Sequence, residues 1–254
     1  MIVYTQNIED ATLAVVTGTA HASYPVDNLA SLVKNKTFRT ASGSSVVPEI
    51  TIDLGSARAC NYLLLGGMSS GIYGGGDFIN LYCGSTDNGS TWDINTVVDA
   101  SIGSENKVFT FNSVSKRYWK IAIEEMDNNA ADYISHIFLG TYYELPNSGE
   151  QNNLVGYNYD NVTAVNNNAY QQRYAIGDRR AAETSLTVRG FTEAQKDAFI
   201  AHFETYCSGT LKPFYFTRDD RSTVTFGHFT NNPFTFRRIT KDFYETTLDI
   251  MEQL

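Results

Sequence analysis

Short runs of apolar residues, separated by Gly, Asn, Asp and Ser, occupy the first 144 residues of the chain. Residues 49–55 (EITIDLG) alternate with period 2, which is typical of a strand with Ile50, Ile52 and Leu54 on one buried face. Residues 60–66 (CNYLLLG) are a short continuous apolar run, as in a strand covered on both sides. Many such strands with turn residues between them predict a β-sandwich over residues 1–144.

The pattern changes after residue 144. Residues 145–169 are rich in Asn and poor in core formers, so we interpret them as a linker or an extended arm. Further on, Thr192 and Gln195 have the spacing of a capping box, and an apolar stripe follows, so a helix is predicted over residues 192–207. With the strand signals around this helix, residues 170–254 are expected to form a small α+β or β-barrel domain.

Composition narrows the classes of partner. The 254-residue chain carries a net charge of −9, and such an acidic surface repels phosphate backbones, so no nucleic-acid recognition is expected. No run of 18 apolar residues is present, so we expect no membrane insertion. The amino end has no basic region of a secretory signal, and three widely spaced cysteines (Cys60, Cys83 and Cys207) favour synthesis in a reducing cytoplasm.

Six short elements in the first part follow one another in a recognisable order, and they cover about residues 20–143. The elements are residues 24–29 (YPVDNL), Phe38-Arg39, 50–55 (ITIDLG), 62–66 (YLLLG), 84–92 (GSTDNGSTW) and 117–121 (RYWKI). They resemble the discoidin (coagulation factor 5/8 C-type) branch of galactose-binding-like sandwiches, in which ligands bind through loops at one end and some members hold a structural Ca²⁺. The chain departs from the pattern at Phe38, where many members carry Trp, and it lacks the two cysteines of extracellular members.

The second part resembles bacteriophage tail-tip proteins in the order of its elements. Residues 134–140 (ISHIFLG) would close the sandwich, the extended segment would follow, and residues 243–250 (FYETTLDI) would form an aromatic-rich final strand of a domain like those of tail-tube and distal-tail proteins. The resemblance implies a closed homo-oligomeric ring, expected to be a hexamer, that contacts the tail tube and the tail-tip or hub proteins. It also implies a virion location after synthesis in the host cytoplasm, and no catalysis.

Several residues are candidates for binding. Tyr73 and Phe78, beside a Gly-rich stretch, could stack on a sugar, and Asp77, Asp87 and Asn88 could supply oxygen ligands to a sugar or to Ca²⁺. For these residues, ordinary roles as core fillers and turn formers are the alternative, and that alternative is favoured for the Asp and Asn residues.

Two basic residues near the expected arm are candidates for contacts between subunits. Arg179 and Arg180 could pair with acidic residues of a neighbouring copy. A solvated turn is an equally good interpretation of the same pair.

No His-x-x-x-His pair, Cys-x-x-Cys pair or Gly-Lys-Ser/Thr phosphate loop is present, so we expect no catalytic residue, no cofactor and no metal. The leading hypothesis is a phage tail-tip or baseplate structural protein, a ring-forming adaptor between tail tube and tip, whose peripheral sandwich contacts host-surface glycan. The alternative is a carbohydrate-binding module of a non-viral bacterial surface or enzyme system. A glycoside hydrolase is a third hypothesis, supported only by association with the fold.

Overall fold

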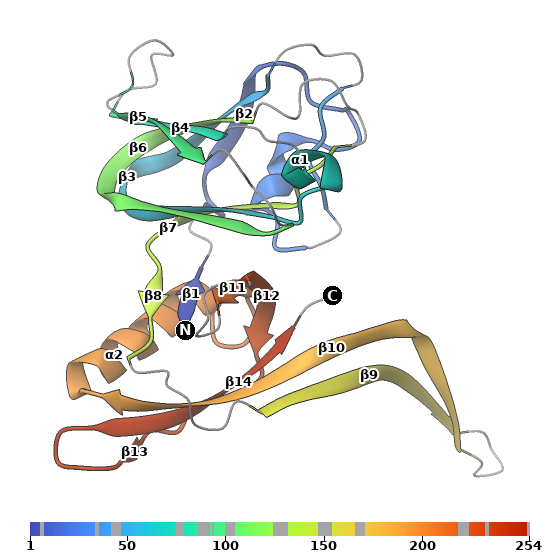
Figure 1. The fold of residues 1–254 in the computed structure, drawn as a ribbon, viewed down its shortest axis with the longest axis vertical. Coiled ribbons are helices and arrows are strands. Elements are labelled where there is room, and N and C mark those ends of the chain that lie inside the picture. Colours follow the sequence, from blue (N-terminus) through green and yellow to red (C-terminus); the bar gives the residue numbers. More distant parts are fainter. Residues whose placement is uncertain are drawn as a thin grey trace. The chain divides into compact units, whose positions relative to one another are not determined.

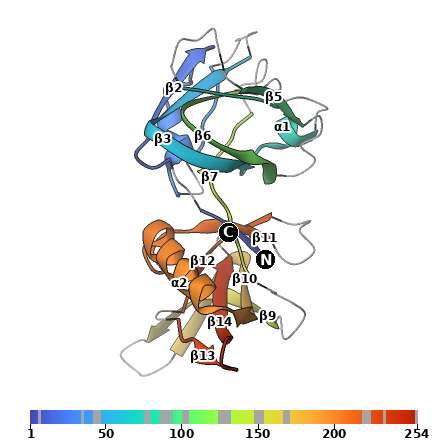
Figure 2. The same cartoon turned by 90° about the vertical axis from the view of Figure 1, so that its left-hand side faces the viewer.

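The computed structural model divides the chain into two units, shown in two views in Figures 1 and 2. The sandwich unit is Tyr4–Tyr142, and the helix-bearing unit combines Met1–Val3 with Tyr143–Leu254. The structure describes residues 1–5, 8–33, 36–41, 47–74, 79–85, 92, 94–99, 105–123, 132–146, 154–165, 171–217, 224–231 and 234–252, with the backbone alone described at 73–74, 94–99, 154–165 and 171–183. Strands predominate in both units, and the predicted mainly β fold class is confirmed.

The sandwich unit is built on one six-stranded sheet that forms two layers, in the strand order β2-β3-β6-β4-β5 with β7 also paired to β3. Two short helical turns, η1 (Val26–Ala30) and α1 (Ser70–Gly74), lie in its connections. The strands are β2 (Thr12–Thr17), β3 (Glu49–Gly66), β4 (Ile79–Gly84), β5 (Ile94–Asp99), β6 (Lys107–Ile123) and β7 (His136–Gly140).

Strands β3 and β6 are long enough to run through both layers. They are antiparallel over twelve residue pairs, with register shifts between Asp53 and Arg58 and between Cys60 and Tyr62. The first half of β3 pairs with β2 and the second half with β7, so the shifts mark where the sheet bends over. The sequence pattern predicted residues 49–55 and 60–66 as two separate strands. The structure joins them because the backbone continues its pairing through the bend, where Gly55 has a φ of +73°.

The core of the sandwich unit consists of the inward-facing residues of these strands. Ile50, Ile52 and Leu54 are all buried, which confirms the face predicted from their alternation. Trp119 of β6 is the largest fully buried side chain. Burial of this contiguous apolar cluster is the main favourable contribution to the stability of the unit.

The helix-bearing unit has an eight-stranded sheet in the order β8-β1-β11-β12-β14-β10-β9, with β13 paired to β14. Strand β1 comes from the amino end of the chain, a long-range pairing that no sequence motif signals. The strands are β1 (Ile2–Tyr4), β8 (Tyr143–Glu144), β9 (Leu154–Val165), β10 (Gln171–Phe191), β11 (Phe214–Thr217), β12 (Val224–Phe229), β13 (Arg237–Arg238) and β14 (Tyr244–Glu252).

Helix α2 (Glu193–His202) provides the apolar side chains that cover one face of this sheet. Thr192 and Gln195 form the predicted capping box, each side chain bonding to the backbone of the other residue. A wider turn continues the helix from Phe203 to Cys207, and it ends where Ser208 and Gly209 both adopt left-handed backbone angles. Phe199 and Phe203 pack with apolar residues of β10, β11, β12 and β14.

Strands β9 and β10 extend beyond the rest of their sheet as a two-stranded ribbon (Figure 1). Strand β10 pairs with β14 only from Glu183 onwards, whereas its pairing with β9 begins at Gln171. Every described pairing of residues 171–182 is therefore to β9, with a register shift between Ala175 and Arg180. Strand β9 lies inside the segment 145–169, which the sequence indicated as a linker or arm, so at least this part of the segment has regular structure.

The helical content also differs from expectation at the Gly-rich stretch. The Gly-rich stretch gave no helix signal in the sequence, but Ser70–Gly74 form the short helix α1. Among the described residues, no helix is long and apolar enough to cross a membrane.

His202 of α2 should make the helix-bearing unit sensitive to acid. Its ring lies 5.3 Å from that of Tyr143 and 4.7 Å from that of Tyr206, and burial lowers its pKa from 6.5 to about 4. The unfolded chain therefore binds a proton more readily than the folded one, so stability is lost as the pH falls from about 6.5 to about 4. This pKa difference limits the loss attributable to His202 to at most about 3 kcal/mol.

His202→Phe keeps an aromatic ring and removes the titration. Acid unfolding, followed by hydrogen exchange of the α2 amides, should then shift to lower pH than in the wild type. Identical acid profiles for the two proteins would contradict this assignment.

Candidate functional site

An arginine held between two tyrosine rings is the most distinctive polar feature of the sandwich unit. The guanidinium carbon of Arg39 lies 4.4 Å from the centre of the Tyr24 ring and 5.2 Å from that of the Tyr133 ring. The His21 ring lies 5.1 Å from Tyr24. These four half-buried residues, His21, Tyr24, Arg39 and Tyr133, are called the Arg39 cluster below.

Backbone hydrogen bonds bring these residues together from distant parts of the chain. The His21 amide donates to the Arg39 carbonyl (2.9 Å), and the Arg39 amide donates to the Tyr24 carbonyl (3.3 Å). The neighbouring residues Phe38 and Ile134 exchange amide–carbonyl bonds of 2.8 and 3.2 Å, and both side chains are fully buried. The bridge between them fixes Arg39 beside Tyr133, so the cluster is anchored in the core.

Helix α1 is tied to the same segment. Ser69, which precedes it, donates from Oγ to Asp132 Oδ1 (2.8 Å) and accepts at Oγ from the Tyr133 amide (3.2 Å). A Cβ at Gly71 would lie 2.1 Å from Asp132 Oδ1, so a larger residue there would displace this carboxylate from Ser69. The loop carrying α1 is therefore held against the segment that supplies one ring of the cluster.

Several polar groups of the Arg39 cluster have no hydrogen-bond partner within the described part of the chain. They are the hydroxyls of Tyr24 and Tyr133, Nε2 of His21, and Nε of Arg39, which is buried. No carboxylate among the described residues pairs with Arg39, and the faces of the two rings partly offset its charge. The cluster thus combines aromatic faces with donors and acceptors that an external ligand can satisfy.

The residues singled out from the sequence are placed only in part. Tyr73 lies on α1, which is tied to the segment that carries Tyr133, but the side chain of Tyr73 is outside the described residues. Asp77, Phe78, Asp87 and Asn88 also lie outside the described residues. Arg179 and Arg180 lie on β10, where Arg180 is opposite Tyr159, and their side chains are also outside the described residues. Their proposed roles stay predictions.

Two of the four residues of the Arg39 cluster, Tyr24 and Arg39, were singled out from the sequence, but only as parts of the motifs that carry the family resemblance. Tyr24 belongs to residues 24–29, and Phe38-Arg39 is one of the matched elements. The signal that could have identified Arg39 is a charged residue directly after an aromatic one that enters the core. Tyr133 carried no comparable signal, because its contact depends on the long-range Phe38–Ile134 bridge.

One serine has the spacing of a hydrolase nucleophile without its chemistry. Residues 67–71 (GMSSG) match Gly-x-Ser-x-Gly, and Ser69 stands between strand β3 and helix α1. However, Ser69 Oγ is hydrogen-bonded to Asp132 and to a backbone amide, and no described histidine bonds to it. Ser69 therefore lacks the Ser–His contact by which such a nucleophile is usually activated. The described residues also contain no group of three or more His, Cys, Asp or Glu side chains that could hold a metal.

Comparison with known proteins gives structural neighbours only. No family model matches the chain, and no curated protein matches it. Among solved structures, the family 32 carbohydrate-binding module from C. perfringens NanJ, in complex with galactose, is 15% identical with a TM-score of 0.42, over 56% of this chain and 100% of the module.

Two other modules give similar values. A family 32 module from a family 31 glycoside hydrolase of Clostridium perfringens is 17% identical (TM-score 0.41; 53% of this chain, 96% of that chain). Chitosan-binding module 1 from a chitosanase/glucanase of Paenibacillus sp. IK-5 is 13% identical (TM-score 0.42; 54% of this chain, 98% of that chain). These three structural neighbours are all carbohydrate-binding modules.

The contact of Arg39 with two rings should contribute to the stability of the sandwich unit. Arg39→Met keeps a long apolar stem but removes the charge, and it should lower the free energy of unfolding by about 1 kcal/mol. Both tryptophans of the chain, Trp92 and Trp119, belong to this unit, so their fluorescence during urea unfolding reports on it alone.

Arg58→Met is the matched control. Arg58 pairs with the exposed Asp10 at 3.4 Å, an ion pair expected to contribute less than about 0.5 kcal/mol. Equal losses in the two variants would show that the rings contribute nothing specific.

Proposed function

We propose that this chain is a non-catalytic binding protein whose sandwich unit binds carbohydrate at the Arg39 cluster. The observation that carries the proposal is the combination of half-exposed aromatic rings with polar groups that lack partners in the described part of the chain. A buried or half-buried polar group without a partner costs free energy, which a bound ligand with matching groups recovers.

The chemistry of the cluster suits a sugar. A pyranose presents an apolar face of C–H groups, which packs on tyrosine, and a rim of hydroxyls, which pair with fixed donors and acceptors. Arg39 supplies a planar set of N–H donors, His21 supplies Nε2, and the tyrosines supply O–H groups. The backbone bonds around Phe38 and Ile134 hold these groups before binding, so little ordering is needed.

The test is binding of glycans to the full chain. A glycan array should give specific responses, and the strongest responding glycan should then be measured by calorimetry, with galactose, a simple pyranose, as a second probe. Arg39→Gln should weaken binding by at least about tenfold, because its donors are charged and pre-positioned.

Arg58→Gln removes the same charge from the same unit and should leave the affinity unchanged. Trp fluorescence should confirm that both variants are folded. Absence of any array response, or equal affinity in wild type and Arg39→Gln, would overturn the assignment of a carbohydrate site to this cluster.

A second function is favoured by the β9–β10 ribbon. A two-stranded ribbon without further sheet neighbours is at best marginally stable in water, and its edges expose unpaired backbone groups. We propose that the ribbon is covered by another copy of this chain in a closed ring, as the tail-tip hypothesis requires. In that setting the helix-bearing unit assembles, and the sandwich unit displays the carbohydrate site on the virion.

Removing the ribbon tests this assembly. Gly156 and Glu183 are directly paired, so residues 157–182 can be replaced by a two-residue Asn-Gly turn without changing the rest of the sheet. Mass photometry should find the wild type as a ring and the shortened chain as a monomer. A monomeric wild type at high concentration, or the same number of subunits in both assemblies, would contradict assembly through the ribbon.

A further inference from the structure

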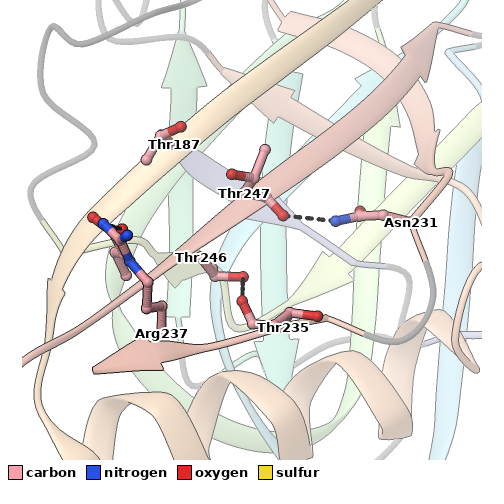
Figure 3. Close-up of a pocket in the computed structure, with 7 residues that line it drawn as sticks. Thr187, Asn231, Thr235, Arg237, Thr246 and Thr247 are labelled. Atoms are coloured by element: carbon pink, nitrogen blue, oxygen red, sulfur yellow. Dashed lines mark hydrogen bonds and ion pairs between the residues drawn. The ribbon is translucent and has the colours of Figure 1, made fainter. Parts of the chain in front are cut away.

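The helix-bearing unit contains a polar cavity of about 400 Å³ on its sheet, shown in Figure 3. Four threonines, one asparagine and an Arg–Glu pair line it, and they come from β10, β13, β14 and the connection before β13. The lining residues are Thr187, Asn231, Thr235, Arg237, Glu245, Thr246 and Thr247.

The cavity lies where strand β14 changes partners. Strand β13 pairs with β14 at Tyr244 and Glu245, and β12 pairs with it from Ile250 onwards. Between these points the side chain of Asn231 takes the place of a neighbouring strand. It donates to the Thr247 carbonyl at 2.6 Å (Figure 3), and it accepts from the Asp249 amide at 3.1 Å. Asn231 therefore satisfies these two backbone groups of β14 and occupies the position that an added strand would need, while the space beside it stays open to a ligand.

Two arginines contact the one carboxylate that lines the cavity. Glu245, whose side chain is 11% exposed, accepts from Arg189 Nε at 3.0 Å through one oxygen and from Arg237 through the other. Two guanidiniums thus meet one carboxylate, and Arg237 has no second carboxylate partner among the described residues. Arg237 is 72% exposed, so part of its planar set of donors faces the open cavity.

Hydroxyl groups surround this charge. Thr187 and Thr247 are directly paired on neighbouring strands, so their side chains share a face, and Thr235 lies on the opposite rim. None of the three hydroxyls has a hydrogen-bond partner among the residues that the structure describes. Asp249 accepts a hydrogen bond from Ser185 at 2.6 Å. It lies four residues beyond Glu245 on the same face of β14, so its negative charge lies about 13 Å from Glu245 and away from Arg237.

We propose that this cavity binds a small polyhydroxylated acid, of the size of a single uronic acid sugar. The carboxylate would pair with Arg237, and the hydroxyls of the ligand would bond to Thr187, Thr247 and Thr235. The volume lies at the lower end of the range for ligand pockets, which limits the occupant to about one ring. This site belongs to the helix-bearing unit, whereas the Arg39 cluster belongs to the sandwich unit. Either proposed site can therefore be disproved without affecting the other.

The threonines that line the cavity also allow its direct observation. The full chain, labelled at the threonine methyl groups, is titrated with glucuronate while methyl NMR spectra are recorded. Signals of Thr187, Thr235 and Thr247 should shift saturably, and glucose, which has the hydroxyls but no charge, should bind at least tenfold more weakly.

Two variants separate the cavity from general charge effects. Arg237→Gln should weaken glucuronate binding at least tenfold. Arg238→Gln removes the same charge from the next residue, whose side chain bonds to the Thr240 and Lys241 carbonyls, and it should bind as the wild type does. Both positions are exposed, and unchanged methyl spectra outside the cavity would confirm that each variant is folded.

Three outcomes would overturn the proposal. The first is a set of threonine signals that glucuronate does not shift saturably. The second is equal binding to wild type and Arg237→Gln. The third is a response to sulfate as strong as the response to glucuronate, because a simple anion would then account for the effect without any contact to the hydroxyls.

Discussion

The antiparallel pairing of β3 with β6 is the interaction on which the rest of the sandwich unit depends. Its twelve residue pairs run through both layers, and every other strand of the unit joins the sheet directly or indirectly through one of the two. The second half of β3 pairs with β7, and the segment leading into β7 carries Ile134, which bridges to Phe38. The position of Arg39 between Tyr24 and Tyr133 is thus a consequence of the same pairing.

Strand β10 has the corresponding role in the helix-bearing unit. Leu186 and Val188 enter the aromatic core under α2, while Thr187 and Arg189 face the other side, where the polar cavity lies. One strand thereby supplies both the stability of the unit and part of a candidate site, as the alternation of side chains along a strand allows. Its first twelve residues leave the sheet with β9, so the same strand also links the core to the ribbon.

Features governed by local chemistry could be predicted from the sequence. The buried face of residues 49–55 follows from period-2 alternation, and the start of α2 follows from the capping box, because both depend on residues a few positions apart. The joining of paired strand segments into β3 and β6 could not be predicted, because turn residues such as Gly55 also occur where a continuous strand bends. Three other features depend on long-range contacts and could not be predicted. Strand β1 pairs in the second sheet, Tyr133 lies beside Arg39, and the Asn231 side chain bonds to the backbone of β14 where a strand would otherwise pair. Residues 67–71 match a local motif that is typical of a hydrolase nucleophile. The structure does not support that role, because Ser69 Oγ bonds to Asp132 and to no described histidine.

The central claim is that glycan binds at the Arg39 cluster, and hydrogen–deuterium exchange of the full chain, free and saturated with the glycan that binds most tightly, tests it most directly. The account predicts slower exchange confined to peptides covering residues 20–25, 36–41 and 132–135, with peptides of β14 unchanged. Protection that appears only outside these three segments, or no protection at saturation, would contradict it.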